Sequence, residues 1–329
     1  MARTHEDWVI LADRRIRNIL KDRRLCSQSQ LEAKISEAGP PDSRPDPQVI
    51  REARRNLLKE AEIKEIRIRG VTPLLYALPS FDIGRERERY ERIRKAYQIY
   101  QRTSREQELC GDVAESIIYR AIILGDSMHI AGGVKEDLRY FNGKKILDEK
   151  PLDSILTHKG TGIALGVEVK NKRKWYHRKD SEMWAALAKC ASIGVLPVFV
   201  ARKLDYLLYP LFSAIGCFGY RLHNQYFHPS VEKELSDVRH KDGLGFADIR
   251  FPKKTKGGFS IEPRHIRYFK KTIPEYIENY SERYNEVLPA LVEYLVERRF
   301  WEEPWDEELF TEFMVEIGVR QPFDEYEGP

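Results

Sequence analysis

The sequence has 329 residues, enough for two modest domains or one large one, and its hydrophobic content of 42% is that of a globular chain with a buried core. Its net charge of +4 is uneven: residues 300–329 carry ten acids against Arg320 alone, a charge of −9 that leaves +13 for the rest of the chain, which fits either a polyanionic partner or an ordinary solvated surface. No stretch approaches about 18 uncharged apolar residues, and the N-terminal MARTHEDWVILADRR lacks the apolar run of a signal peptide, so we expect a cytoplasmic protein that does not enter a membrane.

Residues 1–80 are predicted to form a compact N-terminal unit of helices and a hairpin. Apolar residues recur at helical spacing from Val9 to Leu20, and the following CSQSQLEAKISEAG offers Ser29 as an N-cap with Glu32 completing a capping box. A third helix is expected in DPQVIREARRNLLKEAEI, starting at Asp46 and Pro47. The two short alternating runs in IKEIRIRGVTPLLYAL then predict a hairpin.

Three short helices followed by a hairpin resemble a winged helix-turn-helix domain. This resemblance implies that the third helix enters a DNA major groove, with the basic stripe of Arg51, Arg55 and Lys59 as DNA-binding residues. A small helical domain used for dimerisation or protein docking is the alternative.

Three further segments are expected after the N-terminal unit. Residues 81–110, which include RERERYERIRKAYQIYQRTSREQEL, are predicted to form a charged linker helix. Residues 111–260 alternate between helical and strand-like patterns, which indicates an α/β domain with a central mixed sheet flanked by helices. Residues 261–329 are predicted to form a C-terminal helical extension, in which Pro289 should kink or break a helix.

The segment ALGVEVKNKRKWYH places an acid and an amine on one side of a predicted strand. Glu168 and Lys170 point to the same face because side chains alternate along a strand, and Val167 and Val169 point to the other. Asp153 lies in a second strand-like run upstream. Two carboxylates at neighbouring strand ends form an oxygen-rich pocket suited to Mg²⁺.

This arrangement resembles the PD-(D/E)xK nuclease superfamily, which includes restriction endonucleases and Holliday junction resolvases. Asp153 matches the first acid of the motif, although Leu152 separates it from Pro151, which leaves Asp148 as an alternative. Glu168, Val169 and Lys170 match the ExK triplet. The resemblance also covers ELCGDVAESIIYRAIILG, where Glu115 is expected to turn toward the metal, and it implies a restriction endonuclease-like fold over about residues 108–228.

By resemblance, the reaction is phosphodiester hydrolysis with Mg²⁺, for which Mn²⁺ is expected to substitute. Asp153, Glu168 and Glu115 would be the metal ligands, and Lys170 would orient the attacking water or stabilise developing charge. These four residues are the predicted catalytic group. Other triplets of this kind, such as Glu32 to Lys34, lack the upstream acid and the apolar strand.

The basic run after the triplet is interpreted as a DNA contact. We expect this segment to leave the sheet where a substrate backbone would run, with cations on phosphates and rings on a distorted base. The predicted DNA-binding residues here are Lys172, Arg173, Lys174, Trp175 and Tyr176. The alternative is a flexible solvated loop.

Other polar residues are interpreted as structural. Asp248 follows a glycine-rich turn, His223 and His228 lack the rest of a nuclease or metal motif, and Lys189 is expected at the surface. Cys26, Cys110, Cys190 and Cys217 show no CxxC spacing, which indicates buried thiols. No Walker-type GK[ST] is present, so no nucleotide cofactor is expected.

The resemblances together imply a Mg²⁺-dependent DNA endonuclease, of the restriction or defence type, that acts as a homodimer in order to cut both strands. A structure-specific repair nuclease and a DNA-binding protein that retains the fold without cutting are the alternatives, and cleavage of RNA is left open.

Overall fold

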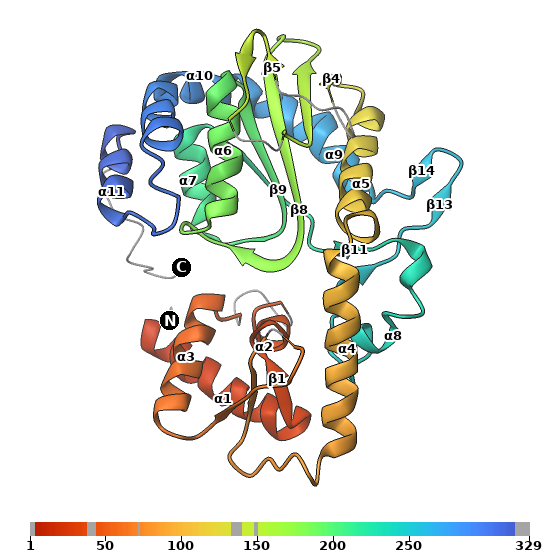
Figure 1. Cartoon of the computed structure of the whole chain (residues 1–329). Coiled ribbons are helices and arrows are strands. Elements are labelled where there is room, and N and C mark those ends of the chain that lie inside the picture. Colours follow the sequence, from red (N-terminus) through yellow and green to blue (C-terminus); the bar gives the residue numbers. More distant parts are fainter. Residues whose placement is uncertain (1–3, 38–43, 72, 133–139, 148–150, 320–329) are drawn as a thin grey trace. The chain divides into compact units, whose positions relative to one another are not determined.

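A computed structural model of the chain describes residues 4–37, 44–71, 73–132, 140–147 and 151–319, and it divides into two compact units (Figure 1). Unit 1 contains the described residues up to Leu109 together with Ser230–Ile249, and unit 2 contains Cys110–Pro229 and the described residues from Arg250 onward. The protein is of the mixed α/β class, with a central five-stranded sheet in unit 2. Among the described residues, no helix is both long enough and apolar enough to cross a membrane.

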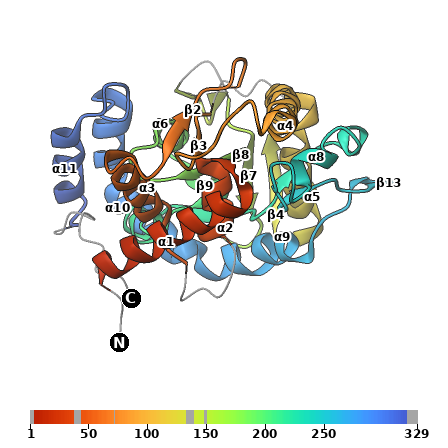
Figure 2. The same cartoon turned by 90° about the horizontal axis from the view of Figure 1, so that it is seen from below.

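Unit 1 begins with three helices and three short strands. In chain order these are α1 (His5–Arg23), β1 (Leu25–Ser27), α2 (Gln28–Ile35), α3 (Pro47–Lys59), β2 (Lys64–Ile66) and β3 (Leu75–Ala77). The strands form an antiparallel sheet in the order β1-β3-β2, which confirms the predicted hairpin of β2 and β3. The three helices pack together around a core that includes Ile16, Leu31 and Ile50 (Figure 2).

The helix caps of unit 1 follow the sequence with one correction. Asp46 caps α3 as predicted, by accepting a hydrogen bond from the N–H of Gln48. The capping box of α2 uses Ser27 and Gln30, so the prediction of Ser29 and Glu32 is wrong. Ser27 is the last residue of β1, and its hydroxyl also accepts a hydrogen bond from the hydroxyl of Tyr97. These tertiary contacts place the N-cap of α2 two residues before the predicted Ser29.

The charged segment after the hairpin forms α4 (Arg87–Arg105) and a 3₁₀ turn, η2 (Gln107–Leu109). It buries Ile93, Ala96 and Tyr97 on one face. This face packs on the segment 230–249, where Tyr97 and Tyr100 contact the ring of Phe246 edge to face. That segment therefore belongs to unit 1, and the α/β unit is not the continuous run of residues 111–260 that the sequence predicts.

The sheet of unit 2 has the order β10-β9-β8-β7-β4. Its strands are β4 (Met128–Gly132), β7 (Ser154–His158), β8 (Ala164–Tyr176), β9 (Leu196–Leu204) and β10 (Phe218–Arg221). The strands β8, β9 and β10 run parallel, and β7 is antiparallel to both β8 and β4. Every residue of β9 is buried, as expected for a central strand that is covered on both faces.

Helices and short ladders complete the first part of unit 2. The helices are α5 (Gly111–Gly125), α6 (Ser181–Ile193) and α7 (Leu208–Ile215), and α6 packs on β8 and β9 while α5 packs on β8. The short strands pair as β5 (Tyr140–Phe141) with β6 (Lys144–Lys145), β11 (Gln225–Tyr226) with β12 (Ile249–Arg250), and β13 (Lys254–Thr255) with β14 (Gly258–Phe259). Two short turns, η3 (Pro229–Val231) and α8 (Ser236–Arg239), lie between β11 and β12 in the chain.

The C-terminal helices are part of the core of unit 2 rather than an extension of it. They are α9 (Pro263–Arg267), the π turn η4 (Tyr268–Thr272), α10 (Ile273–Leu291), the π turn η5 (Val292–Glu297) and α11 (Glu307–Glu316). Their buried rings join the cluster that surrounds the sheet; Phe310 and Phe313, for example, contact Trp184 of α6 edge to face.

Of the predicted kink or break at Pro289, the break is wrong, because α10 continues through Pro289 and changes to π geometry only at Val292. Proline removes one N–H donor, but Leu291 and Leu295 on either side of the change are buried in the core. Packing therefore holds the segment helical despite the proline.

Candidate functional site

Strand β8 places alternate side chains in two different environments. Val167 and Val169 belong to the main hydrophobic cluster, while Gly166 faces Leu152, Cys190 and Val195 in a smaller one. Glu168 and Lys170 share the face of Gly166, as the alternation predicts.

Gly166 allows the elements around this face to approach closely. A Cβ atom at this position would lie 2.7 Å from Sγ of Cys190 and 2.8 Å from Cδ1 of Leu152, closer than atoms can pack. The missing side chain therefore lets α6 and the start of β7 close onto β8. Since Leu152 precedes Asp153, this packing also sets the position of that carboxylate.

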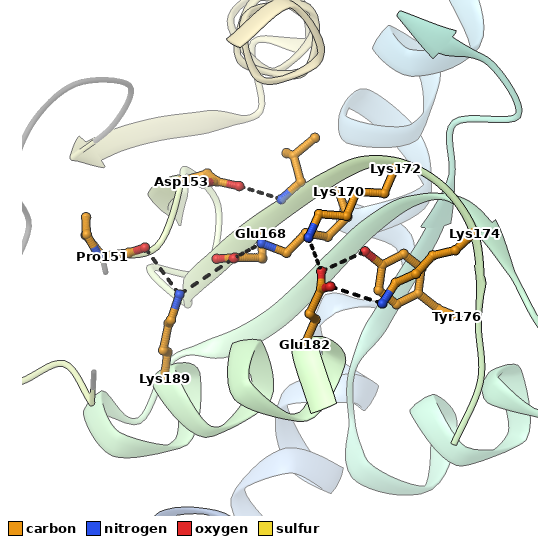
Figure 3. A network of polar contacts seen from close by, with 10 residues as sticks. Pro151, Asp153, Glu168, Lys170, Lys172, Lys174, Tyr176, Glu182 and Lys189 are labelled. Carbon is orange, nitrogen blue, oxygen red and sulfur yellow. Dashed lines mark hydrogen bonds and ion pairs between the residues drawn. The ribbon is translucent and has the colours of Figure 1, made fainter. Parts of the chain in front are cut away.

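Asp153 is held against the ExK triplet by the backbone. Ser154 pairs with Val167 in the antiparallel register of β7 and β8, which brings Asp153 opposite Glu168. Oδ2 of Asp153 accepts a hydrogen bond of 2.6 Å from the N–H of Val169, the residue between Glu168 and Lys170 (Figure 3). The structure thus brings together Asp153, Glu168 and Lys170, while the alternative acid Asp148 lies outside the described residues.

The carboxylate of Glu168 is buried and only half satisfied. Its Oε1 accepts a hydrogen bond from the ammonium of Lys170, and Nζ of Lys189 lies 3.6 Å from the same oxygen (Figure 3). Its Oε2 is also buried and has no hydrogen-bond partner among the described residues. An orphaned buried carboxylate oxygen is costly unless another group satisfies it, so this atom fits a cation or a donor that the chain itself does not supply.

The expectation of Lys189 at the surface is wrong, because its side chain is only 6% exposed. Lys189 lies on the buried face of α6 with Ala186 and Ile193, at spacings of three and four residues. Its Nζ lies 3.5 Å from the carbonyl oxygen of Pro151 as well as near Glu168. The lysine therefore ties α6 to both strands of the candidate site.

Burial and neighbouring charges shift the pKa values of Asp153 and Lys170. Burial raises the pKa of Asp153 well above its ordinary value, and the negative charges of Glu168 and Glu115 raise it further. Burial alone would lower the pKa of the Lys170 ammonium, but Glu168 and Asp153 outweigh burial, so that pKa is raised. The neighbouring carboxylates therefore disfavour the charged form of Asp153 and favour the charged form of Lys170.

Glu115 lies on α5 and acts on Asp153 through its charge, as expected for a residue turned toward the same site. The described residues contain no cluster of three or more His, Cys, Asp or Glu side chains arranged to ligate one ion. Mg²⁺ commonly takes only one or two protein carboxylates and completes its shell with water and substrate phosphate oxygens. Asp153 and Glu168 fit that requirement.

The basic run that follows the triplet stays in the sheet instead of leaving it. Strand β8 extends to Tyr176, with an irregular register against β9 between Lys170 and Trp175. Lys172 and Lys174 both contact the carboxylate of Glu182 on α6, at 2.8 and 3.1 Å (Figure 3). These two bonds lower the pKa of Glu182 to about 2, although burial opposes the shift.

The two predicted stacking rings differ in their surroundings. The ring of Tyr176 is fully buried and its hydroxyl donates to Glu182, so it presents no face to a base. Trp175 is half-buried and lies beside Lys203 and Arg221. Arg173 is half-buried as well. Neither the contact of Glu182 with the two lysines nor the burial of Lys189 was predicted from the sequence.

In unit 1, the basic stripe of α3 lies opposite its buried face. Arg55 and Lys59 are exposed and Arg51 is half-buried, whereas Val49 and Leu57 are buried. None of the three basic residues forms an ion pair with another described residue. The stripe is therefore available to solvent, as the sequence predicts.

The remaining polar candidates do not join the site. His223 has a left-handed backbone with φ of 63°, and burial together with nearby Arg221 lowers its pKa to about 4. His228 contacts the ring of Phe259 edge to face. Asp248 belongs to unit 1, which does not contain Asp153 or Glu168. All four cysteines are buried free thiols, in agreement with the sequence analysis.

Comparisons of the chain with protein-family models, with curated proteins and with solved structures find no match.

Proposed function

We propose that the protein is a Mg²⁺-dependent DNA endonuclease of the PD-(D/E)xK type, with unit 2 as its nuclease domain. The observation that carries the proposal is the hydrogen bond of Asp153 to the N–H of Val169, which joins the upstream acid to the middle of the ExK triplet. An isolated triplet has little meaning, but an acid from the adjacent antiparallel strand, bonded to that triplet and facing its glutamate, is the arrangement that the motif requires.

The topology supports the same proposal. The first acid precedes β7, the triplet lies in the antiparallel neighbour β8, and α6 then leads to the parallel strand β9. A mixed sheet of this connectivity, with a helix carrying Glu115 before it, is what a restriction endonuclease-like fold is expected to have.

Two carboxylates of this site fit Mg²⁺, because Oε2 of Glu168 has no partner among the described residues, and burial together with the charges of Glu168 and Glu115 disfavours the ionised form of Asp153 unless a cation compensates it. Asp153 and Glu168 would hold the ion, with Glu115 oriented toward its water shell. When bound, the ion would withdraw charge from a scissile phosphate and lower the pKa of a water molecule.

Neighbouring residues would hold the two carboxylates in place. The backbone of Val169 fixes the rotamer of Asp153, and Lys189 restrains Glu168 from the α6 side. The side chain of Lys170 is 22% exposed beside Glu168, where its ammonium can orient a water molecule for attack or donate to an oxygen that gains negative charge. Lys172 and Lys174 would neutralise backbone phosphates near the site.

Unit 1 would hold DNA as a winged helix domain. Its element order of helix, strand, two helices and a hairpin, with the third strand beside the second, is that of such a domain. Its third helix exposes Arg55 and Lys59 toward solvent. Recognition by one unit and cleavage by the other suits a restriction or defence nuclease, and a homodimer would supply one catalytic site for each strand.

Digestion of supercoiled plasmid, linear duplex, branched DNA and RNA, with Mg²⁺ and with EDTA, tests the proposal. We expect Mg²⁺-dependent cleavage of DNA that Mn²⁺ also supports and that is lost in Glu168→Ala. Equal cleavage by the parent and Glu168→Ala contradicts the proposal, as does an absence of cleavage on every substrate. Preference for branched DNA would indicate a structure-specific nuclease instead of a restriction enzyme.

A further inference from the structure

A group of rings and cations lies at the C-terminal ends of β8, β9 and β10, beyond the candidate metal site. It contains Trp175 at the end of β8, Lys203 near the end of β9, Tyr206 just after β9, Tyr209 in α7, and Arg221 at the end of β10. We call these five residues the ring–arginine cluster. Trp175 follows Lys170 by five positions in β8, but the register is irregular between them, so that Lys170 pairs with Ala201 and Trp175 with Lys203, only two positions further along β9.

Arg221 is the centre of the cluster. Its guanidinium carbon lies 5.5 Å from the ring centroid of Trp175 and 5.5 Å from that of Tyr206. Lys203 adds a second cation 5.5 Å from the ring of Trp175. Because its planar group contacts two rings, the side chain of Arg221 is ordered before any ligand arrives.

Arg221 carries no carboxylate partner among the described residues. Its polar contact is with Tyr209, and its buried Nε has no hydrogen-bond acceptor. The indole N–H of Trp175 is likewise buried without an acceptor in the described part of the chain. The acid Glu262, which acts electrostatically on the adjacent His223, is already engaged by Arg264 at 3.0 Å and by Tyr226.

The surface of the cluster offers aromatic area as well as charge. Tyr206 is 53% exposed and Tyr209 is 37% exposed, so both present ring surface to solvent beside Arg221. One side of the Tyr206 ring contacts Arg221, and much of the ring remains open to solvent. The ring of Tyr206 next to the guanidinium of Arg221, which has no carboxylate partner among the described residues, matches a ligand that has a flat ring and a phosphate close together.

We propose that the ring–arginine cluster binds an unpaired nucleotide of a single-stranded nucleic-acid segment, with the base stacked on Tyr206 and the phosphate held by Arg221. A base inside a duplex is covered on both faces by its neighbours, so only an unpaired base can stack on Tyr206. The cluster would thus extend the nucleic-acid surface past Lys172 and Lys174, toward a strand that has separated from its complement. The choice of nucleic acid rests on the proposed nuclease function.

Equilibrium binding to fluorescein-labelled oligonucleotides in EDTA tests this assignment without cleavage. The probes are oligo-dT, oligo-rU, an abasic strand of the same length, and a blunt duplex. The ring variant is Tyr206→Leu, with Tyr276→Leu as the matched control because Tyr276 is also exposed, at 44%, but lies on α10. The cation variant is Arg221→Lys, and its matched control is Arg267→Lys on the exposed side of α9.

We expect Tyr206→Leu to weaken oligo-dT binding about tenfold, a typical effect of removing one stacking ring, while binding of the abasic strand and the duplex stays within twofold. Arg221→Lys should weaken oligo-dT and the abasic strand alike, by several-fold, since its fork contacts phosphate. The two control variants should match the parent. The oligo-rU arm shows whether the cluster accepts RNA as well as DNA, since stacking on a ring is possible for either.

Unchanged oligo-dT binding by Tyr206→Leu overturns the proposal, and so does an equal loss on the abasic strand or on the duplex. Absence of oligo-dT binding by the parent overturns it as well. A protein that cuts no substrate yet shows the expected pattern of binding would refute the nuclease function alone, because these measurements contain no divalent cation.

Discussion

Oδ2 of Asp153 accepts a 2.6 Å hydrogen bond from the backbone N–H of Val169, the residue that separates Glu168 from Lys170. A strand therefore presents a carboxylate, an amide and an ammonium within one short segment, and a neighbouring strand contributes the second carboxylate. The bond also makes the position of Asp153 depend on the register of β7 and β8 rather than on a loop. A shift of this register by one residue would move Glu168 and Lys170 to the other face of the sheet, away from Asp153.

Asp153→Asn should abolish Mg²⁺-dependent cleavage without unfolding the protein. The amide oxygen of asparagine can still accept from Val169, whereas the charge needed for the cation is lost. Because burial and the charges of Glu168 and Glu115 raise the pKa of Asp153, removing its charge should leave the melting temperature unchanged or raise it. We expect cleavage to fall at least about 100-fold, as for a metal-site carboxylate. Single-turnover digestion and calorimetry measure the two effects.

Glu168→Ala provides the comparison for that result. It removes the partner of both Lys170 and Lys189, so it should lose cleavage and also lower stability. A variant Asp153→Asn that melts normally and still cuts at the parental rate would refute the role of Asp153.

Lys189→Met should increase the stabilisation of the protein by divalent cations. Two lysines offset the buried charge of Glu168, and removal of Lys189 leaves more of that charge uncompensated. The metal-free variant should lose about 3 kcal/mol of stability, as for a broken buried ion pair. Mg²⁺ should then raise its melting temperature by more than it raises that of the parent.

Lys179→Met serves as the control for this measurement. Lys179 pairs with Glu307 at the surface, and its loss should change stability little. Equal shifts of the melting temperature with Mg²⁺ in Lys189→Met and the parent would show that the ion does not bind beside Glu168.

The local features of the site were predictable because they follow from rules that act over a few residues. Alternation along a strand gave Glu168 and Lys170 a common face, and the Asp46–Pro47 pair indicated the start of α3. The pairing of Asp153 with the triplet was inferred from a motif, and the structure places the two side by side through the register of β7 and β8.

The features that were missed depend on contacts between distant parts of the chain. Ser27 caps α2 because strand β1 and Tyr97 hold it, and residues 230–249 join unit 1 through the ring of Phe246. Lys189 is buried because Glu168 compensates its charge, which no hydrophobicity pattern can reveal. In each case a partner far along the sequence outweighs the local preference.

Glu182→Gln should strengthen binding of DNA, because it frees Lys172 and removes one of the two carboxylates that hold Lys174. Lys172 is paired with the carboxylate of Glu182, and Lys174 is paired with both Glu182 and Asp180, so the two lysines contact phosphate only in competition with these carboxylates. Neutralising Glu182 should tighten binding of a 20-base-pair duplex several-fold at low salt and steepen the salt dependence of the binding constant. The joint variant Lys172→Gln/Lys174→Gln should weaken binding and flatten that dependence.

The direction in which Glu182→Gln changes the affinity for DNA shows whether the lysines contact phosphate or only stabilise the fold. If the lysines served only to hold α6 against β8, the variant would lose stability and its DNA affinity would not rise. Titrations of duplex DNA from 50 to 300 mM salt, roughly the range over which counterion release is measured, distinguish these outcomes.

Stability should fall between neutral and acid pH because of His265. Its ring is fully buried, with the hydroxyls of Tyr220 and Tyr226 at 2.7 and 2.8 Å from its two nitrogens. Burial, aided by Arg264, lowers the pKa of His265 to about 4 from the ordinary 6.5. Above pH 6.5 neither the folded nor the unfolded chain protonates this ring, so it has no effect on stability there.

As the pH falls from 6.5 to 4, the unfolded chain binds a proton that the folded chain excludes, so the folded state loses stability through this window and the loss levels off below pH 4. The full effect is about 3 kcal/mol, since one pKa unit corresponds to about 1.4 kcal/mol. Urea unfolding of the parent and of His265→Gln at pH 7, 6, 5 and 4 measures it, with His5→Gln as a control because His5 is exposed. The parent and His5→Gln should lose stability more steeply than His265→Gln over this range. Parallel curves for all three proteins would show that His265 accepts a proton in the folded state as readily as in the unfolded chain.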